Sequence, residues 1–294
     1  MSKPGVDFQT YATEACKDEE AKLLILSPHG ADYHWTFEQF PELNALKTDV
    51  FINYLRIEQD FGADQIAQKL AEFLCQADIK VKIAKTQYHR GILDGGRKTK
   101  IALRDALPKI TRQTLSERLT SLHLSSIDLI KGECERIKRV NGYVIDMHTM
   151  AAFSPQLGPN YKYIEATFEN LEEYTNSYTR EKNLNNLRPI DILTKDENGI
   201  QITDAELSNH LFETLQTAGY EVSFNYPYEN NSYYMMNEYL SIAQGVAIDI
   251  PKHLFSEQSL DNFDLLSFSI CERKVSRLAR LIADAVLSQA NFKA

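Results

Sequence analysis

The apolar residues of this chain fall into two kinds of run, which predict a sheet and the helices that cover it. Short runs with little or no charge at 22–27, 142–146 and 245–250 are typical of strands buried on both faces. Residues 80–85 alternate apolar side chains with lysines, which indicates a strand with one face toward water. Helical spacing of apolar residues predicts helices over 62–76, 114–140 and 263–289, and a Thr-x-x-Glu capping pattern at 203–206 predicts another to about residue 217.

These elements alternate along the chain as expected of an α/β protein. The strands near 80–85 and 142–146 are joined by helical material, which makes a βαβ unit. With 294 residues, the chain is long enough for one large α/β domain or two small ones. Residues 1–20 are polar and predict a short lead-in, and we interpret the polar, acidic residues 161–200 as an excursion from the main domain. We therefore predict one domain over residues 1–294.

The net charge limits the classes of partner. Asp and Glu outnumber Lys and Arg by 41 to 32, giving a net charge of −9, which argues against sequence-independent binding of nucleic acid. A small carboxylate substrate stays possible, because a pocket can carry arginines on an acidic protein. The N-terminus has no secretory signal, no apolar run approaches the ~20 residues that span a bilayer, and the four cysteines are scattered. We expect a cytoplasmic protein with reduced thiols and no membrane contact; the pattern predicts no oligomeric state.

Two histidines follow predicted strands. Residues 22–27 lead into His29, and residues 142–146 lead into His148. Ligands of open α/β sheets bind just beyond the carboxyl ends of the strands, so a shared metal ion is one interpretation. A single histidine is more often an ordinary surface or core residue. Zinc often takes two histidines and a carboxylate, for which Asp60 and Asp64 are the candidates; either one could instead only cap the helix at 62–76.

Further charged residues stand in unusual surroundings. Arg90 and Arg97 frame Asp94 in a glycine-rich loop, where both guanidinium groups could bind a carboxylate; the alternative is a solvated basic loop. Asp249 lies inside the apolar strand 245–250. A buried carboxylate needs a partner, so Asp249 either meets a cation or metal-bound water, or faces solvent on an edge strand.

Six short motifs, in order along the chain, resemble those of the N-formylglutamate amidohydrolases. They are Ser27-Pro28-His29-Gly30, Asp60-Phe-Gly-Ala-Asp64, Arg90-x-x-x-Asp94-x-x-Arg97, Ile145-Asp146-Met147-His148-Thr149, Asn225-Tyr-Pro-Tyr228 and Ile248-Asp-Ile-Pro-Lys-His-Leu-Phe255. The similarity runs from about residue 22 to about residue 258. It implies the core of the zinc carboxypeptidases and aspartoacylases, a mixed, mostly parallel sheet with helices on both faces.

The resemblance also implies the residues of a catalytic metal site. One zinc ion per chain would be held by His29, His148 and Asp60, with Asp64 as the alternative third ligand. Asp249 stands where the family has a glutamate that acts as general base, so the side chain here is shorter by one methylene. Asp146 is expected behind the metal ligands.

Substrate contacts follow from the same resemblance. Arg90 and Arg97 would hold substrate carboxylates or the developing oxyanion, and Asp94 would orient an arginine in the substrate site. Gly96 replaces the asparagine of the family's Asp-Leu-Asn-Arg pattern. We also expect Tyr228 or Tyr233 to line the pocket.

The expected activity is zinc-dependent hydrolysis of the amide of an N-acyl amino acid, N-formylglutamate or a related N-acyl acidic amino acid. One alternative is a carboxypeptidase- or aspartoacylase-like hydrolase of another substrate. The other is a non-catalytic binding protein on the same fold, which the changes at Gly96 and Asp249 keep open.

Overall fold

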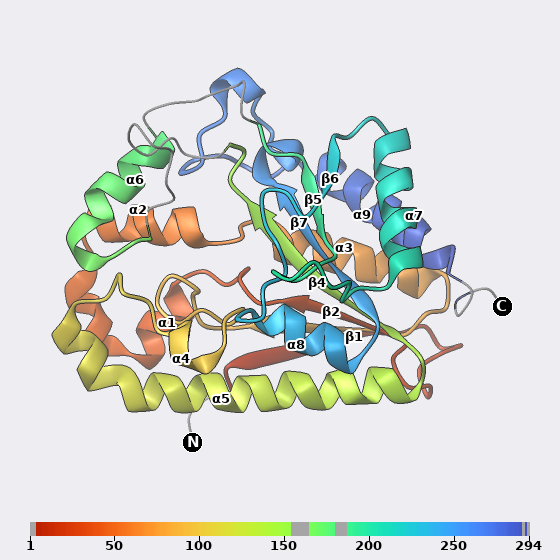
Figure 1. Ribbon diagram of the computed structural model, residues 1–294, viewed down its shortest axis with the longest axis horizontal. Helices are drawn as coiled ribbons and strands as arrows, with labels where there is room; N and C mark the ends of the chain where they lie inside the picture. The colour runs from red at the N-terminus through yellow and green to blue at the C-terminus, as the bar shows by residue number, and fades with distance from the viewer. Residues whose placement is uncertain (1–3, 154–164, 180–186, 290–291, 293–294) are drawn as a thin grey trace.

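A sheet of seven strands runs through the middle of the molecule in the computed structural model, which describes residues 4–153, 165–179, 187–289 and 292 (Figure 1). Within the described residues its order is β1-β3-β2-β4-β7-β5-β6. β2, β3, β4 and β7 are mutually parallel neighbours, whereas β1 and β5 pair antiparallel to β3 and β7. The strands are β1 (Val6–Tyr11), β2 (Leu23–Ser27), β3 (Val81–Thr86), β4 (Tyr143–Met150), β5 (Ile190–Leu193), β6 (Val222–Phe224) and β7 (Gly245–Pro251).

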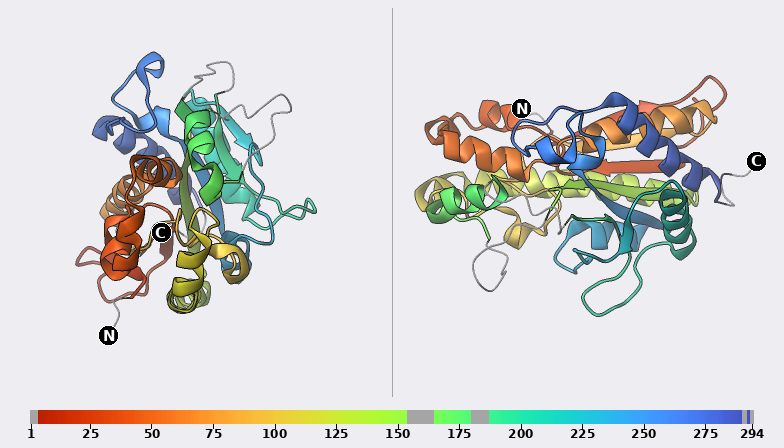
Figure 2. Two further views of the ribbon diagram at one scale, coloured as in Figure 1. Left: turned by 90° about the vertical axis from the view of Figure 1, so that its left-hand side faces the viewer. Right: turned by 90° about the horizontal axis from the view of Figure 1, so that it is seen from above.

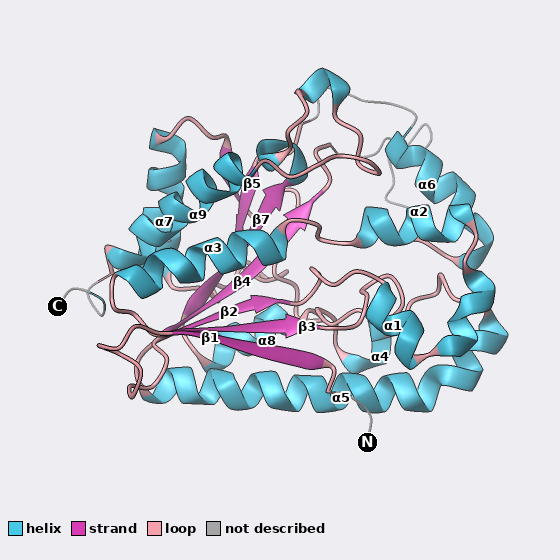
Figure 3. Ribbon diagram, turned by 180° about the vertical axis from the view of Figure 1, so that it is seen from behind, coloured by secondary structure: helices cyan, strands magenta, loops and turns pink. Residues whose placement is uncertain are grey.

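Helices cover both faces of the sheet, so the predicted class, a single α/β domain with a mixed and mostly parallel sheet, is confirmed. α3, α7 and α9 pack on one face, and α5 and α8 pack on the other (Figures 2 and 3). The α-helices are α1 (His34–Gln39), α2 (Asp49–Glu58), α3 (Ala63–Gln76), α4 (Thr99–Ala102), α5 (Lys109–Arg139), α6 (Leu171–Thr179), α7 (Ala205–Thr217), α8 (Met235–Ile242) and α9 (Glu272–Leu287). Short 3-10 helices are η1 (Pro41–Leu46), η2 (Phe168–Asn170), η4 (Lys252–Phe255) and η5 (Leu260–Asn262).

β2, β4 and β7 begin with uncharged runs because each face of the sheet has its own core. In β2, Leu23 and Ile25 join the core under α3 and α9, while Leu24 and Leu26 join the core under α5 and α8. Successive side chains of a strand point to opposite faces, so a strand covered on both sides has no polar alternate. This explains the uncharged runs by which the strands at 22–27, 142–146 and 245–250 were predicted.

The structure differs from the expected elements where local polarity misleads. β3 is not wet on one face: it lies between β1 and β2, and Lys85 is buried with its Nζ 3.5 Å from Oδ2 of Asp64. Polar β1, expected as lead-in, closes the edge beside it. α5 is continuous through residues 125–126, and α9 begins at Glu272, nine residues after the expected start.

The segment 161–200, expected to be a polar excursion, contributes directly to the sheet. Residues 161–164 and 180–186 lie outside the described residues, but Ile190–Leu193 forms β5 beside β7, and α6 packs against α2. β5 is four residues long, too short to stand out in polar surroundings. None of the helices in the described parts of the chain is long and apolar enough to cross a membrane.

Candidate metal centre

The two strand-associated histidines are brought together by strand pairing. β2 and β4 are parallel neighbours, and His29 follows the end of β2, while β4 extends further than predicted and contains His148. Asp60 lies in the turn between α2 and α3, and its backbone N–H donates to the carbonyl oxygen of His29 at 3.0 Å. Three segments far apart in sequence therefore meet at the carboxyl end of the central parallel strands.

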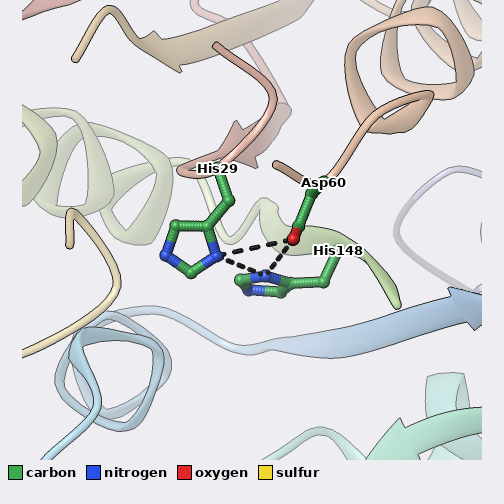
Figure 4. Close-up of side chains that lie close together, drawn as sticks. All are labelled: His29, Asp60 and His148. Atoms are coloured by element: carbon green, nitrogen blue, oxygen red, sulfur yellow. Dashed lines mark hydrogen bonds and ion pairs between the residues drawn. The ribbon is translucent and has the colours of Figure 1, made fainter. Parts of the chain in front are cut away.

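The side chains of His29, Asp60 and His148 converge on one point and could hold a metal ion (Figure 4). Nδ1 of His29 lies 3.2 Å from Nδ1 of His148 and 3.4 Å from Oδ2 of Asp60, and Nδ1 of His148 lies 3.1 Å from that oxygen. A tetrahedral ion with bonds of ~2.0–2.1 Å holds its ligand atoms roughly 3.3 Å apart. The three atoms thus have the spacing of ligands around such an ion.

The far nitrogen of each ring faces a second carboxylate. Nε2 of His29 lies 2.7 Å from Oδ1 of Asp94, and Nε2 of His148 lies 3.2 Å from Oδ1 of Asp146. An ionised carboxylate only accepts hydrogen bonds, so a histidine that donates from Nε2 to the carboxylate behind it has its Nδ1 lone pair available for a metal ion. Carboxylates behind histidines are a regular feature of metal sites, since they fix the tautomer and the ring orientation.

The charges around the cluster favour a cation at its centre. Burial by itself would lower the pKa of His148, but the carboxylates of Asp146 and Asp60 outweigh burial and raise that pKa well above its usual range. Burial likewise opposes ionisation of Asp60, but Arg90 and the two histidines hold the pKa of its carboxyl well below the usual value. Asp60 is therefore an anionic oxygen donor, as a metal ligand needs to be.

Asp64, the alternative third ligand, points elsewhere. Its Oδ1 accepts a hydrogen bond from Oγ of Ser27 at 2.5 Å, and its Oδ2 lies 3.5 Å from Nζ of Lys85. These partners lie on β2 and β3. Of the two candidate carboxylates, only Asp60 joins the histidine cluster.

Asp94 lies behind His29 as well as beside the arginines that it was expected to orient. It is 1% exposed, and its Oδ2 lies 3.2 Å from Nε of Arg97, 3.5 Å from Nη1 of Arg104 and 3.7 Å from Nη2 of Arg90. Asp94 therefore orients a histidine and groups three arginines around one carboxylate. Arg104 was not predicted, because a single arginine in α4–α5 connecting sequence carries no recognisable motif.

Gly96 allows the close approach of this loop to the histidine. Its N–H donates to Oδ1 of Asp94 at 3.0 Å, and a Cβ atom at this position would lie only 2.6 Å from Nε2 of His29. Any larger residue would push on the ring. A glycine in place of the family's asparagine is thus consistent with the position of the His29 ring, which leaves no room for a Cβ atom.

Arg90 and Arg97 both reach the space in front of the cluster. Nη1 of Arg90 donates to Oδ1 of Asp60 at 3.0 Å, and Nη1 of Arg97 donates to Oε1 of Glu165 at 3.0 Å. Glu165 is the more exposed of the partners, its side chain being 55% accessible. The predicted convergence of the two arginines is present, and the alternative of a solvated basic loop does not apply, since both are largely buried.

Asp249 faces the cluster from β7. Strand register places it beside His148 of β4 on one side and Asp191 of β5 on the other, so it lies inside the sheet and not at an edge. It is 8% exposed, and no described residue hydrogen-bonds to its Oδ1. Burial, followed by the nearby charge of Asp60, raises the pKa of Asp249 to about 6.

Of three further residues near Asp249, one was expected and two were not. Tyr228 lines the cavity as expected, and its hydroxyl accepts a hydrogen bond from Nη1 of Arg188 at 2.9 Å. Arg188 precedes β5, in the segment interpreted as an excursion, so its link to the site was hidden. Lys252, in η4, is buried, and burial lowers its pKa to about 8. Lys252 belongs to the Ile248–Phe255 motif and follows Asp249 by three residues. This proximity in sequence could have indicated that Lys252 lies near the site.

A cavity of about 1230 Å³ opens over the cluster and unites these groups. His29, Asp60, His148 and Asp249 all line it. The described lining residues are nearly balanced in charge, with seven lysines and arginines and six aspartates and glutamates. The cations are Arg90, Arg97, Lys100, Arg104, Arg112, Arg188 and Lys252. Arginines next to the cluster offer places where an anionic group could bind.

Two solved structures resemble this one over nearly their whole length. N-formylglutamate amidohydrolase from Ralstonia eutropha JMP134 has a TM-score of 0.54 and 13% sequence identity, with 95% of this chain and 97% of that chain covered. A gene product from Agrobacterium tumefaciens has a TM-score of 0.51 and 13% identity, with 97% and 94% covered. Neither a protein-family model nor a curated protein matches the sequence. At this identity the likeness is one of fold: the chain has the fold of N-formylglutamate amidohydrolase, as the resemblance of its motifs predicted.

Proposed function

We propose that this protein is a metal-dependent amidohydrolase that hydrolyses an N-acyl amino acid, N-formylglutamate or a related N-acyl acidic amino acid. One observation carries the proposal: the cluster of His29, Asp60 and His148 opens into the same cavity as the Asp249 carboxylate. A metal site, a nearby carboxylate of raised pKa and arginines in the cavity lining together are what hydrolysis of an anionic amide requires.

Zinc is the ion we propose, one per chain. Two imidazole nitrogens and one carboxylate oxygen are a recurrent ligand set of catalytic zinc, and the donor atoms here have matching separations. When bound, zinc would polarise a carbonyl oxygen and lower the pKa of a water molecule to ~7. Asp94 and Asp146 would keep the rings in the orientation and tautomer that this binding needs.

Asp249 is the proposed general base. Its Oδ1 would take a proton from the attacking water and deliver it to the nitrogen of the leaving amine. The water oxygen joins the acyl carbon as the amide C–N bond breaks, so the products are a carboxylate and a free amino acid. A carboxyl group with a pKa of about 6 is suited to accept a proton near neutral pH and to release it again.

Arginines would bind the carboxylates of the substrate and the developing negative charge. Arg97 already contacts the exposed carboxylate of Glu165, which indicates how an incoming carboxylate could reach this side chain. Arg90 lies next to the cluster, where it would stabilise an oxyanion. Arg188 and Tyr228, hydrogen-bonded to each other, offer a further polar pair in the lining of the cavity.

The proposal is tested by metal content and then by a substrate panel. Elemental analysis of the purified protein should find about one zinc per chain. N-formyl, N-acetyl and N-succinyl derivatives of glutamate, aspartate and alanine should then be compared, with N-acetylaspartate and a peptide with a free C-terminus representing the aspartoacylase and carboxypeptidase alternatives. We expect release of the amino acid from N-acyl acidic substrates above the others. Zinc uptake without hydrolysis of any panel member would reject the substrate class, and absence of metal uptake would favour a binding protein.

A further inference from the structure

Lys252 is a buried cation beside the cluster to which the proposed reaction assigns no role. It follows β7 directly, in η4, and is 1% exposed. Its Nζ donates to the carbonyl oxygen of Gln59 at 2.6 Å and to that of Ile57 at 3.3 Å. Both carbonyls belong to the last residues of α2 and its C-cap, immediately before Asp60.

The two carbonyl groups are ones that a helix end leaves unsatisfied. The last carbonyls of an α-helix have no intrahelical partner, and a cation at that end also interacts favourably with the helix dipole. Lys252 therefore fixes the path of the chain where it leaves α2, one residue before Asp60. On the other side, the N–H of Asp60 is held by the carbonyl oxygen of His29 at 3.0 Å.

A second buried lysine, Lys85, forms an ion pair with a carboxylate instead of bonding to backbone carbonyls. Lys85 lies 3.5 Å from Oδ2 of Asp64 and pairs with that side chain directly, on the side of β2 and β3. Lys252 instead donates hydrogen bonds to two backbone carbonyls and leaves the carboxylate of Asp60 for the cluster. The two lysines thus distinguish the two acidic residues that the sequence offers as the third ligand.

We propose that Lys252 is a positioning residue of the metal centre, which holds Asp60 in place through the carbonyl groups of residues 57 and 59. The inference rests on the proposed metal site. It predicts a change in metal affinity on removal of Lys252 that is opposite in sign to the change expected from charge repulsion alone. A positive charge close to a bound cation repels it, so removal of Lys252 on charge grounds alone would strengthen metal binding. Positioning predicts that removal weakens it.

The affinity for zinc decides between these signs. Wild-type protein and the Lys252→Met and Lys252→Gln variants are stripped of metal, and their zinc dissociation constants are measured by competition with a chromophoric chelator. We expect zinc binding about 10–100-fold weaker in Lys252→Met, the usual cost of losing an outer partner of a metal ligand. Lys252→Gln, which keeps a shorter neutral donor, should lie between Met and wild type and covers the case in which Lys252→Met does not fold.

The matched control is Lys274→Met. Nζ of Lys274 also donates to a backbone carbonyl, that of Ser256 at 2.7 Å at the end of η4, but Lys274 is not among the cavity-lining residues described. Its zinc affinity should equal that of wild type, with thermal unfolding recorded for every variant. Wild-type zinc binding combined with equal or tighter binding by folded Lys252 variants would overturn the role of Lys252 alone. A wild-type protein that takes up no zinc would overturn this role together with the proposed metal centre.

Discussion

The cavity has two walls that treat their carboxylates differently. The paired wall, formed by Glu58, Asp60, Arg90 and Arg104 with Asp94 behind it, brings each carboxylate within 4 Å of at least one arginine. The strand wall, formed by Asp249 on β7 with Arg188 and Tyr228, leaves Oδ1 of Asp249 without a hydrogen bond from any described residue. Both walls are buried, so the contrast lies in their partners.

The difference separates a binding role from a reactive one. Arginines compensate the cost of burying the carboxylates of the paired wall, and Asp60 and Asp94 are held ionised with pKa values well below normal, although burial opposes this. On the strand wall, burial is less well compensated and raises the pKa of Asp249 to about 6. One wall is arranged to hold positive charge, and the other keeps a carboxyl group that can exchange a proton near neutral pH.

Removal of a histidine from the cluster should have the largest effect. His148→Ala leaves Asp60 and His29 as the only two donors of the candidate site, so we expect the protein to retain no metal after dialysis. Elemental analysis checks this, with His210→Ala as the control because His210 bonds to Ser288 and Gln289 and is not a described lining residue. One zinc per chain in His148→Ala would remove His148 from the ligand set.

The strand wall is tested by Asp249→Asn. The variant keeps the shape of the side chain but cannot take up a proton, so turnover should fall about 10²–10⁴-fold, the usual contribution of a general base. Metal content should stay at the wild-type level, because Asp249 is not in the cluster. Undiminished hydrolysis by a zinc-loaded Asp249→Asn protein would reject the assignment.

The paired wall should respond to Asp94→Asn with loss of metal affinity. The variant removes the negative charge behind His29 and the counter-charge of three arginines, so we expect zinc binding about 10–100-fold weaker and a lower melting temperature. Chelator competition and thermal unfolding measure both. Asp196→Asn, in a surface turn, controls for the substitution itself. If zinc affinity were unchanged, Asp94 would have no part in orienting His29.

Acid should lower the free energy of unfolding through His89, a fully buried histidine next to Arg90 in the chain, and this is the smallest of these effects. Burial lowers the pKa of His89 to about 4, and an unfolded histidine titrates near ~6.5. The unfolded chain therefore binds the proton first as pH falls from 6.5 toward 4, and stability present above that range is lost by up to ~1.4 kcal/mol per pH unit. His89→Asn keeps an acceptor for the N–H of Gly91 and removes the titration.

Urea unfolding of metal-free protein at pH 7, 6 and 5 measures this effect. The free energy of unfolding should fall less steeply with acid in His89→Asn than in wild type. Equal slopes in the two proteins would mean that His89 does not titrate on unfolding.

Most of the sheet and the histidine pair could be predicted, because buried parallel strands leave a strong local pattern. β2, β4 and β7 each begin with an uncharged run, so the polar residues that follow the run stand out in the sequence. β1 and β5 were missed, since one is polar along an edge and the other is four residues long.

The family resemblance favoured Asp60 as the third ligand, but the residues by themselves left Asp64 open, and the charge pairing around the site could not be predicted. Asp60 and Asp64 are four residues apart, and both are acidic residues near the start of α3, so local sequence does not distinguish them. Only tertiary contacts direct Asp64 to Lys85 and Ser27. The position of Asp94 behind His29 depends on the fold of a glycine-rich loop. Isolated cations such as Arg188 have no motif, so their place in the cavity follows only from the three-dimensional structure.

The close packing of Gly96 against His29 limits which single substitutions the loop can accept. The N-formylglutamate amidohydrolase pattern carries an asparagine at this position, but a Cβ atom here would lie 2.6 Å from Nε2 of His29. A side chain could be accommodated at this position only if the histidine ring moved as well. Substitution of Gly96 is therefore coupled to the position of a candidate metal ligand.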